Sequence, residues 1–206
     1  MSGMKIKNAR GKQLNIDRFE TRPDQSWCFA GTNRSGIREL FDLICGKTRN
    51  VEAAKLLLDR EIGRVSFKDQ QEIFEQELKN DDSDYLDRQD PGTLGRAFIE
   101  HPERHMELID NLDMVPCLDK GYRQMSTGQA RKLLIISLIS QGFSVLAIQA
   151  PFEGLDVKSR EDISRALECL AEQGIQVLLF VHNPDDIPPW CSHLALVQHG
   201  EIVLQG

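Results

Sequence analysis

Two unbroken apolar stretches constrain this chain more than any other feature. Residues 144–149 read SVLAIQ and residues 175–181 read IQVLLFV, and between them lies a helical pattern that ends at Gly174. A strand that is apolar on both faces is typical of a parallel sheet covered on both sides. Parallel neighbours also need a long crossover connection, which the helix between them supplies. The sequence therefore predicts an α/β fold with a parallel core sheet.

A strand, a tight loop and a helix are predicted within residues 26–46. The apolar run SWCFAG ends at Gly31, and after TNRSG apolar residues recur at helical spacing: Ile37, Leu40, Phe41 and Ile44. The remaining strands are expected at the edges of the fold. They comprise one or two edge strands within residues 4–20, one strand at 63–69, and a terminal hairpin at 193–206 that turns on His199-Gly200.

A polar, acidic stretch separates these two groups of strands. Between Gln70 and about Lys120 the patterns QQEIFEQEL, TLGRAFIE and ERHMELIDNLDM each predict a helix. A further apolar helix follows, with Ser126 as its N-cap and Gly142 as its stop. We expect a helical subdomain, at about residues 66–140, inserted into the α/β core.

Composition argues against several classes of protein. A formal net charge of -7 over 206 residues disfavours a protein whose main task is to grip nucleic acid. The five cysteines are odd in number and lack metal-ligand spacing, which favours a reducing, cytoplasmic setting. No apolar run approaches the roughly 18 residues that a membrane helix needs. His101 and His105 are four residues apart but lack a third ligand, so no metal site is predicted.

The loop after the first core strand has part of a phosphate-binding pattern. Such a loop reads G-x-x-x-x-G-K-[S/T] between a strand and a helix, so that backbone N–H groups face phosphate. Gly31 and Gly36 have this separation, but Ile37 stands in place of lysine and Arg38 in place of Ser/Thr. From these residues alone, a plain strand-to-helix turn is the competing interpretation.

Three further stretches of sequence resemble motifs of one protein family, and they follow one another in the order found in that family. MSTGQARK, residues 125–132, resembles the L-S-G-G-Q signature of ATP-binding-cassette (ABC) ATPases, and a long apolar helix follows it as in that family. VLAIQAPFEGLD resembles the family's strand ending D-E-P-x-x-x-L-D, with Pro151, Leu155 and Asp156 matching. VLLFVHNPDDI is similar to the later strand that ends in the family's switch histidine, here His182, although a core or edge histidine is the alternative.

The resemblance implies a fold and an assembly. It predicts one P-loop NTPase ABC cassette over residues 1–206, with a parallel core sheet, an antiparallel β edge and the inserted helical subdomain. The sequence around these motifs is most similar to that of the tandem molybdenum transport ATP-binding or photorepair proteins. The chain is therefore expected to be half of a tandem or dimeric protein. In the family, ATP and Mg²⁺ lie between one cassette's phosphate loop and the other cassette's signature.

The residues of the signature keep their family types, and those of the chain's own site do not. By resemblance, the signature residues Ser126, Thr127, Gly128 and Gln129 would serve a partner's ATP, and Asp156 would lie at the dimer seam. Gln149 replaces the aspartate that holds the metal, and Ala150 replaces the glutamate that polarises water. The degenerate ATP-binding loop comprises Gly31, Asn33, Arg34, Ser35, Gly36, Ile37 and Arg38.

These departures predict weak or absent ATP binding, and poor or no hydrolysis, at this domain's own site. Arg34 or Arg38 offers one route to residual phosphate binding. Phe19 is a candidate for the family's adenine-stacking aromatic. The glutamine that precedes the family's helical subdomain is either Gln70 or Gln71, while the alignment itself places Lys68 there.

Partners and alternatives follow from the same resemblance. We expect a second cassette, in the same chain or another subunit, a membrane permease as a further partner, and a cytoplasmic location with attachment to the inner membrane through a partner. One alternative is a catalytically dead pseudo-ATPase that acts as a scaffold or regulator. Another is a DNA-repair-associated ABC ATPase, against which the net charge of -7 counts.

Overall fold

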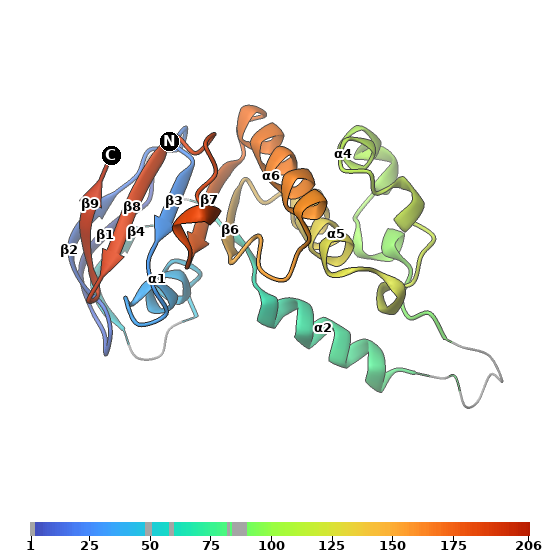
Figure 1. The fold of residues 1–206 in the computed structure, drawn as a ribbon, viewed down its shortest axis with the longest axis horizontal. Coiled ribbons are helices and arrows are strands. Elements are labelled where there is room, and N and C mark those ends of the chain that lie inside the picture. Colours follow the sequence, from blue (N-terminus) through green and yellow to red (C-terminus); the bar gives the residue numbers. More distant parts are fainter. Residues whose placement is uncertain (1–2, 48–50, 58–59, 82, 84–89) are drawn as a thin grey trace. The chain divides into compact units, whose positions relative to one another are not determined.

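The computed structural model describes residues 3–47, 51–57, 60–81, 83 and 90–206. The chain divides into two compact units (Figure 1). The first unit comprises Met1–Arg64, Ser144–Pro151 and Leu167–Gly206, and the second comprises Val65–Phe143 and Phe152–Ala166.

The first unit contains a mixed six-stranded sheet in the order β5-β6-β7-β3-β8-β9. The pairs β6–β7, β7–β3 and β3–β8 are parallel, and β9 is antiparallel to β8. Every residue of β7 is buried, as is almost all of β6, which explains the two unbroken apolar stretches. The strands are β3 (Trp27–Ala30), β5 (Ile62–Val65), β6 (Val145–Gln149), β7 (Gln176–Val181), β8 (His193–Gln198) and β9 (Glu201–Gln205).

A three-stranded antiparallel sheet, in the order β2-β1-β4, completes the strands of this unit. It consists of β1 (Lys5–Arg10), β2 (Asn15–Glu20) and β4 (Glu52–Leu57). The sequence did not predict β4, because its composition of Glu, Ala, Lys and Leu favours a helix. Pairing with β1 over the full length of β4 overrides that local preference.

The core of the first unit joins both sheets to α1 (Ile37–Ile44). The four apolar residues predicted at helical spacing are buried on α1. An aromatic cluster fills the centre, with ring centroids 4.8 Å apart for Phe29–Phe180 and 5.0 Å apart for Phe19–Trp27. Burial of these side chains fixes where β3 and α1 lie on either side of the loop between them.

The second unit is helical. Its helices are α2 (Phe67–Lys79), α4 (Met106–Asn111), α5 (Thr127–Ser140) and the first part of α6 (Val157–Glu172). Short 3-10 turns connect them, at η1 (Gly95–Phe98), η2 (Pro102–Arg104), η3 (Val115–Cys117) and η4 (Tyr122–Gln124), and a fifth, η5 (Pro184–Asp186), belongs to the first unit. The parallel core strands, the antiparallel sheet and the helical insertion that the sequence predicted are all present.

Two local predictions were wrong. The strand predicted at 63–69 ends at Val65, because the Ser66 side chain accepts a hydrogen bond from the Asp69 backbone N–H and caps α2. The stretch TLGRAFIE forms only the 3-10 turn η1, since Gly95 N–H bonds to the distant Lys120 carbonyl. In both places a hydrogen bond outside the local periodic pattern decided the conformation.

Candidate functional site

The 31–38 loop turns its key side chain into the core. Ile37, at the position of the family's lysine, is 1% exposed and belongs to the core of the first unit. Ser35 Oγ lies 3.3 Å from Ile37 N and accepts its hydrogen bond, so an amide at the start of α1 is already occupied. Arg34 and Arg38 are exposed, as is Asn33. The cationic side chains of this loop therefore lie at the surface, and the apolar one does not.

Gly36 has a structural reason to be glycine. It adopts a φ of 93°, and a Cβ placed there would lie 2.0 Å from the carbonyl oxygen of Gln13. The Gly200 N–H donates to the Ser35 carbonyl at 2.7 Å, so the terminal hairpin packs directly on this loop. Close packing between two turns accounts for the second glycine of the phosphate-loop pattern without any ligand.

The end of β6 carries no carboxylate. Gln149 is half-buried, and Ala150 is buried with a φ of 47°, a left-handed conformation that is unfavourable for a residue with a Cβ. The Ala150 N–H donates to the Phe180 carbonyl at 2.8 Å, which ties the strand end to β7. The two residues therefore offer an amide and a methyl group where the family has two acids.

A pocket of about 620 Å³ opens beside this loop, at the carboxyl ends of β3, β7 and β8. His182 follows β7, and its Nδ1 lies 3.2 Å from the Gly31 carbonyl oxygen. Arg34 and His199 also line the pocket, and His199 was not singled out by the sequence except as a hairpin turn. The lining residues are Ala30, Gly31, Thr32, Arg34, Ser35, His182, Pro184, Leu196, Val197, Gln198 and His199. Because this lining contains basic groups and no acid, its chemistry suits an anion better than a metal ion.

The signature turn, residues 126–129, begins helix α5 with a complete capping box. Ser126 Oγ accepts from Gln129 N at 3.2 Å, and Gln129 Oε1 accepts from Ser126 N at 3.1 Å. Ser126 and Thr127 are exposed, and the first turn of α5 contains no acidic residue. Lys120 Nζ also donates to Gln129 Oε1 at 2.9 Å, which adds positive charge beside the turn. This helix start is therefore ordered, exposed and favourable to an anion.

Gly128 packs against the turn that contains Asp156. A Cβ on Gly128 would lie 3.5 Å from Ser159 Cβ and 3.7 Å from a Leu155 methyl group, which is ordinary contact. Asp156 caps α6, since its carboxylate accepts from Ser159 N at 2.8 Å and from Ser159 Oγ at 2.9 Å. These hydrogen bonds, led by the one from the Ser159 backbone N–H, lower the pKa of Asp156.

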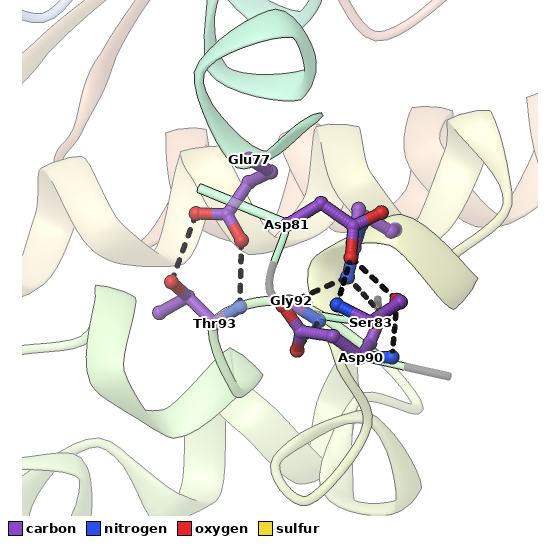
Figure 2. Close-up of polar contacts among 7 residues, drawn as sticks. Glu77, Asp81, Ser83, Asp90, Gly92 and Thr93 are labelled. Carbon is purple, nitrogen blue, oxygen red and sulfur yellow. Dashed lines mark hydrogen bonds and ion pairs between the residues drawn. The ribbon is translucent and has the colours of Figure 1, made fainter. Parts of the chain in front are cut away.

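A polar cluster ties the end of α2 to residues 90–93 (Figure 2). Glu77 Oε2 accepts from Thr93 N at 2.6 Å, and Glu77 Oε1 accepts from the Thr93 hydroxyl at 2.8 Å. Arg123, which lies in η4, pairs with Asp81 and with Asp90, whose Oδ2 lies 2.9 Å from Arg123 Nη2. The guanidinium of Arg123 holds the pKa of Asp81 below its ordinary value. The chain entering the signature turn is thereby tied to the end of α2.

The structure shows which of the other candidate site residues are buried and which are exposed. Phe19 is 1% exposed, with its ring against Trp27 and Phe29, so neither ring face is open to a base. Gln70 is buried beside the signature turn, whereas Gln71 is exposed and Lys68 lies at the helix surface. Within the described residues, no group of three or more His, Cys, Asp or Glu side chains is placed to hold a metal ion.

Solved structures decide the fold. The structure of cbiO1 from Clostridium perfringens, part of the ABC transporter complex cbiONQ, matches with a TM-score of 0.75 at 18% identity, over 100% of this chain and 88% of that chain. A nucleotide-free ATP-binding cassette from an ABC transporter matches with a TM-score of 0.76 at 17% identity, over 100% and 91% of the two chains. This chain has the fold of an ABC cassette. A dimeric post-hydrolysis structure of the cassette MJ0796, bound to ADP and Pi, matches with a TM-score of 0.69 at 16% identity, over 98% and 97% of the two chains.

Sequence relatives point to the same family. The ABC transporter ATP-binding protein ModF of Escherichia coli is 28% identical over 183 residues, which cover 86% of this chain and 37% of that protein. The energy-coupling factor transporter ATP-binding protein EcfA2 of Clostridium perfringens is 28% identical over 148 residues, covering 71% and 51% of the two proteins. No family model matches the chain. The resemblance to ABC-type nucleotide-binding cassettes is confirmed.

Two further findings concern the length of the relatives and the possibility of a membrane-spanning helix. The chain spans 37% of ModF, 41% of an ABC transporter ATP-binding protein from Clostridium tetani and 51% of EcfA2, so these relatives are longer proteins. In the part of the chain that the structure describes, no helix combines the length and the apolar character needed to cross a membrane.

Proposed function

We propose that this cassette lends its signature turn to the ATP site of a second cassette and does not itself hydrolyse ATP. The ordered, exposed capping box at the start of α5 is the observation that carries the proposal. The partner cassette lies in the same chain or in another subunit. The process served is that of a molybdenum-transport or photorepair type ATPase, and in a transport system a permease would hold the pair at the cytoplasmic face of the inner membrane.

Hydrogen-bond geometry at Ser126 supports this role. Its Oγ already accepts from Gln129 N at 3.2 Å, which uses a lone pair and leaves the hydroxyl hydrogen available to donate. The backbone N–H groups of Thr127 and Gly128 belong to the first turn, where α-helical amides have no partner within the helix. ATP held by the partner would supply the γ-phosphate as acceptor, and this turn would supply hydroxyl and amide donors together with the positive end of the α5 dipole.

The chain's own site supports the second half of the proposal. Mg²⁺ prefers carboxylate and water oxygens, and the β6 end offers Gln149 and Ala150. Ile37 has no charge with which to bind a phosphate, and its side chain is buried. These residues do not fit a magnesium–triphosphate complex, although Arg34, His182 and His199 leave a basic pocket in which an anion could still bind. The same observations favour a second candidate, a pseudo-ATPase that serves only as a scaffold or regulator.

Substitutions in the signature turn of the complete protein test the proposal and separate the two candidates. We expect Ser126→Ala to lower ATP turnover about 100-fold, the effect of removing one preorganised donor. Gly128→Ala should lower it as well, because a side chain beside the first-turn amides leaves less room for a phosphate to approach them, while the methyl group makes only ordinary contacts with Leu155 and Ser159 and the fold should tolerate it. Gln124→Ala, an exposed change in the neighbouring turn, serves as the control.

The outcomes are distinct. Unchanged turnover in both signature variants contradicts the partner role and leaves the scaffold candidate. Hydrolysis of ATP with Mg²⁺ by this chain alone contradicts the inert-site half of the proposal. Calorimetry of the isolated chain with ATP and Mg²⁺ measures whether the basic pocket still holds the nucleotide.

A further inference from the structure

We propose that Gln70 is a positioning residue for the signature turn, an inference that rests on the proposed function of that turn. Gln70 lies on α2, is 7% exposed, and is separated from Thr127 by 57 residues in the chain. Its Nε2 donates to the Thr127 carbonyl at 3.2 Å, and its Oε1 accepts from Arg131 Nε at 3.0 Å. The two ends of a single amide therefore hold α5 at two points, at Thr127 in its first turn and at Arg131 in its second.

The chemistry of the site requires an amide. A carbonyl oxygen has two lone pairs, so the Thr127 carbonyl can take the bond from Gln70 in addition to its bond within α5. The Arg131 guanidinium can only donate, so its neighbour must accept. Only a side chain with one donor end and one acceptor end satisfies both groups, whereas a carboxylate would face the Thr127 carbonyl with like partial charge.

Arg131 extends the contact to the other side of the signature turn. Its side chain is 1% exposed, its Nη1 donates to the Glu153 carbonyl at 3.3 Å, and its burial lowers its pKa while Glu153 opposes that shift. Glu153 begins the segment whose Leu155 and Ser159 lie against Gly128. The signature turn is thus held from α2 through Gln70 and from the start of α6 through Arg131, all within the second unit.

The neighbouring glutamine provides a matched control. Gln71 is exposed, and its Nε2 donates to Glu75 Oε1 at 2.9 Å along the surface of the same helix. Gln70→Leu removes both bonds to α5. Gln70→Glu keeps the acceptor for Arg131 and loses the donor to Thr127. Gln71→Ala changes the same residue type, one position along, without touching α5.

The test combines two measurements on the complete protein. We expect Gln70→Leu and Gln70→Glu to lower kcat for ATP about tenfold, with KM changed less than twofold, because a misplaced signature affects the reacting geometry more than nucleotide capture. Hydrogen exchange of the backbone amides at 126–131 should be at least about threefold faster in both variants, since these amides lose a fixed turn. Gln71→Ala should match the wild type in both measurements. Because Gln70→Glu keeps the contact to Arg131, the test can still be made with this variant if Gln70→Leu fails to fold.

The exchange measurement distinguishes a failure of this inference from a failure of the proposed function. Unchanged exchange at 126–131 in Gln70→Glu overturns the positioning role, as does unchanged kcat in a protein whose Ser126→Ala variant has lost turnover. Faster exchange with turnover unaffected by both Gln70→Glu and Ser126→Ala supports the positioning role and removes the proposed function of the turn.

Discussion

The first turns of α1 and α5 begin from similar sequences and reach opposite states. RSGI and MSTG each place a serine just before the helix, yet Ser35 is buried and Ser126 is exposed. At α1 the serine bonds to Ile37 N and the next side chain enters the core. At α5 the serine and Gln129 cap each other while Thr127 faces solvent. A helix N-terminus is therefore an anion site only where the fold leaves its amides and side chains accessible.

The largest expected effect comes from restoring the family's lysine in the 31–38 loop. Ile37→Lys carries a charge into the core of the first unit, so we expect the free energy of unfolding to fall by about 3 kcal/mol, without a gain in ATP affinity. Denaturant titration and calorimetry measure the two quantities. Arg38→Ala, an exposed neighbour, is the control and should stay within about 0.5 kcal/mol of the wild type. A stable Ile37→Lys variant that binds ATP would show that the loop can open outward.

Paired serine substitutions sharpen the contrast between the two helix starts. Ser126→Ala removes a capping box, and Ser35→Ala removes the acceptor for Ile37 N, so each should lower unfolding free energy by about 1 kcal/mol. Only Ser126→Ala should also lower turnover in the complete protein. Equal losses of turnover in the two variants would mean that stability, rather than exposure of the turn, controls activity.

The strained end of β6 should become more stable with glycine. Ala150 has a φ of 47°, so we expect Ala150→Gly to raise unfolding free energy by about 0.5–1 kcal/mol, the left-handed strain less the backbone entropy of glycine. Ala147→Gly, in the same strand, should instead lower it by about 1 kcal/mol, because Ala147 packs in the core. Thermal unfolding of both variants checks the opposite signs. A loss in both would indicate that the Ala150 methyl group contributes packing that outweighs its strain.

The smallest expected effect is the pH dependence of stability that Asp156 contributes as the cap of α6. The pKa of Asp156 is lowered in the folded chain, so its charged form stabilises the fold above the ordinary carboxyl pKa, and this stabilisation is lost as pH falls through the folded value. Wild type and Asp156→Asn should therefore differ most in stability above about pH 4, and converge at lower pH. Melting temperatures from pH 7 to pH 3 measure this. A difference independent of pH would mean that the carboxylate charge is not what caps α6.

The sequence by itself determined the elements whose local pattern agrees with their environment. The apolar runs gave β6 and β7, helical spacing gave α1, and Ser126 with Gly142 set the ends of α5 to within two residues. The order in which the phosphate-loop pattern, the signature and the two later strand motifs follow one another predicted the ABC cassette fold. These features were readable because burial, periodicity and capping all act within a few residues of one another in the chain.

Only the tertiary structure decided which side chains of the candidate sites face solvent and which meet one another. β4 exists because β1 pairs with it, against its own helical composition. Ile37 is directed inward by a core assembled from distant strands. Gln70 reaches Thr127 across 57 residues, and no local pattern distinguishes it from Gln71. Contacts between residues far apart in the chain leave no periodic trace in sequence, so their geometry became known only once the chain was folded.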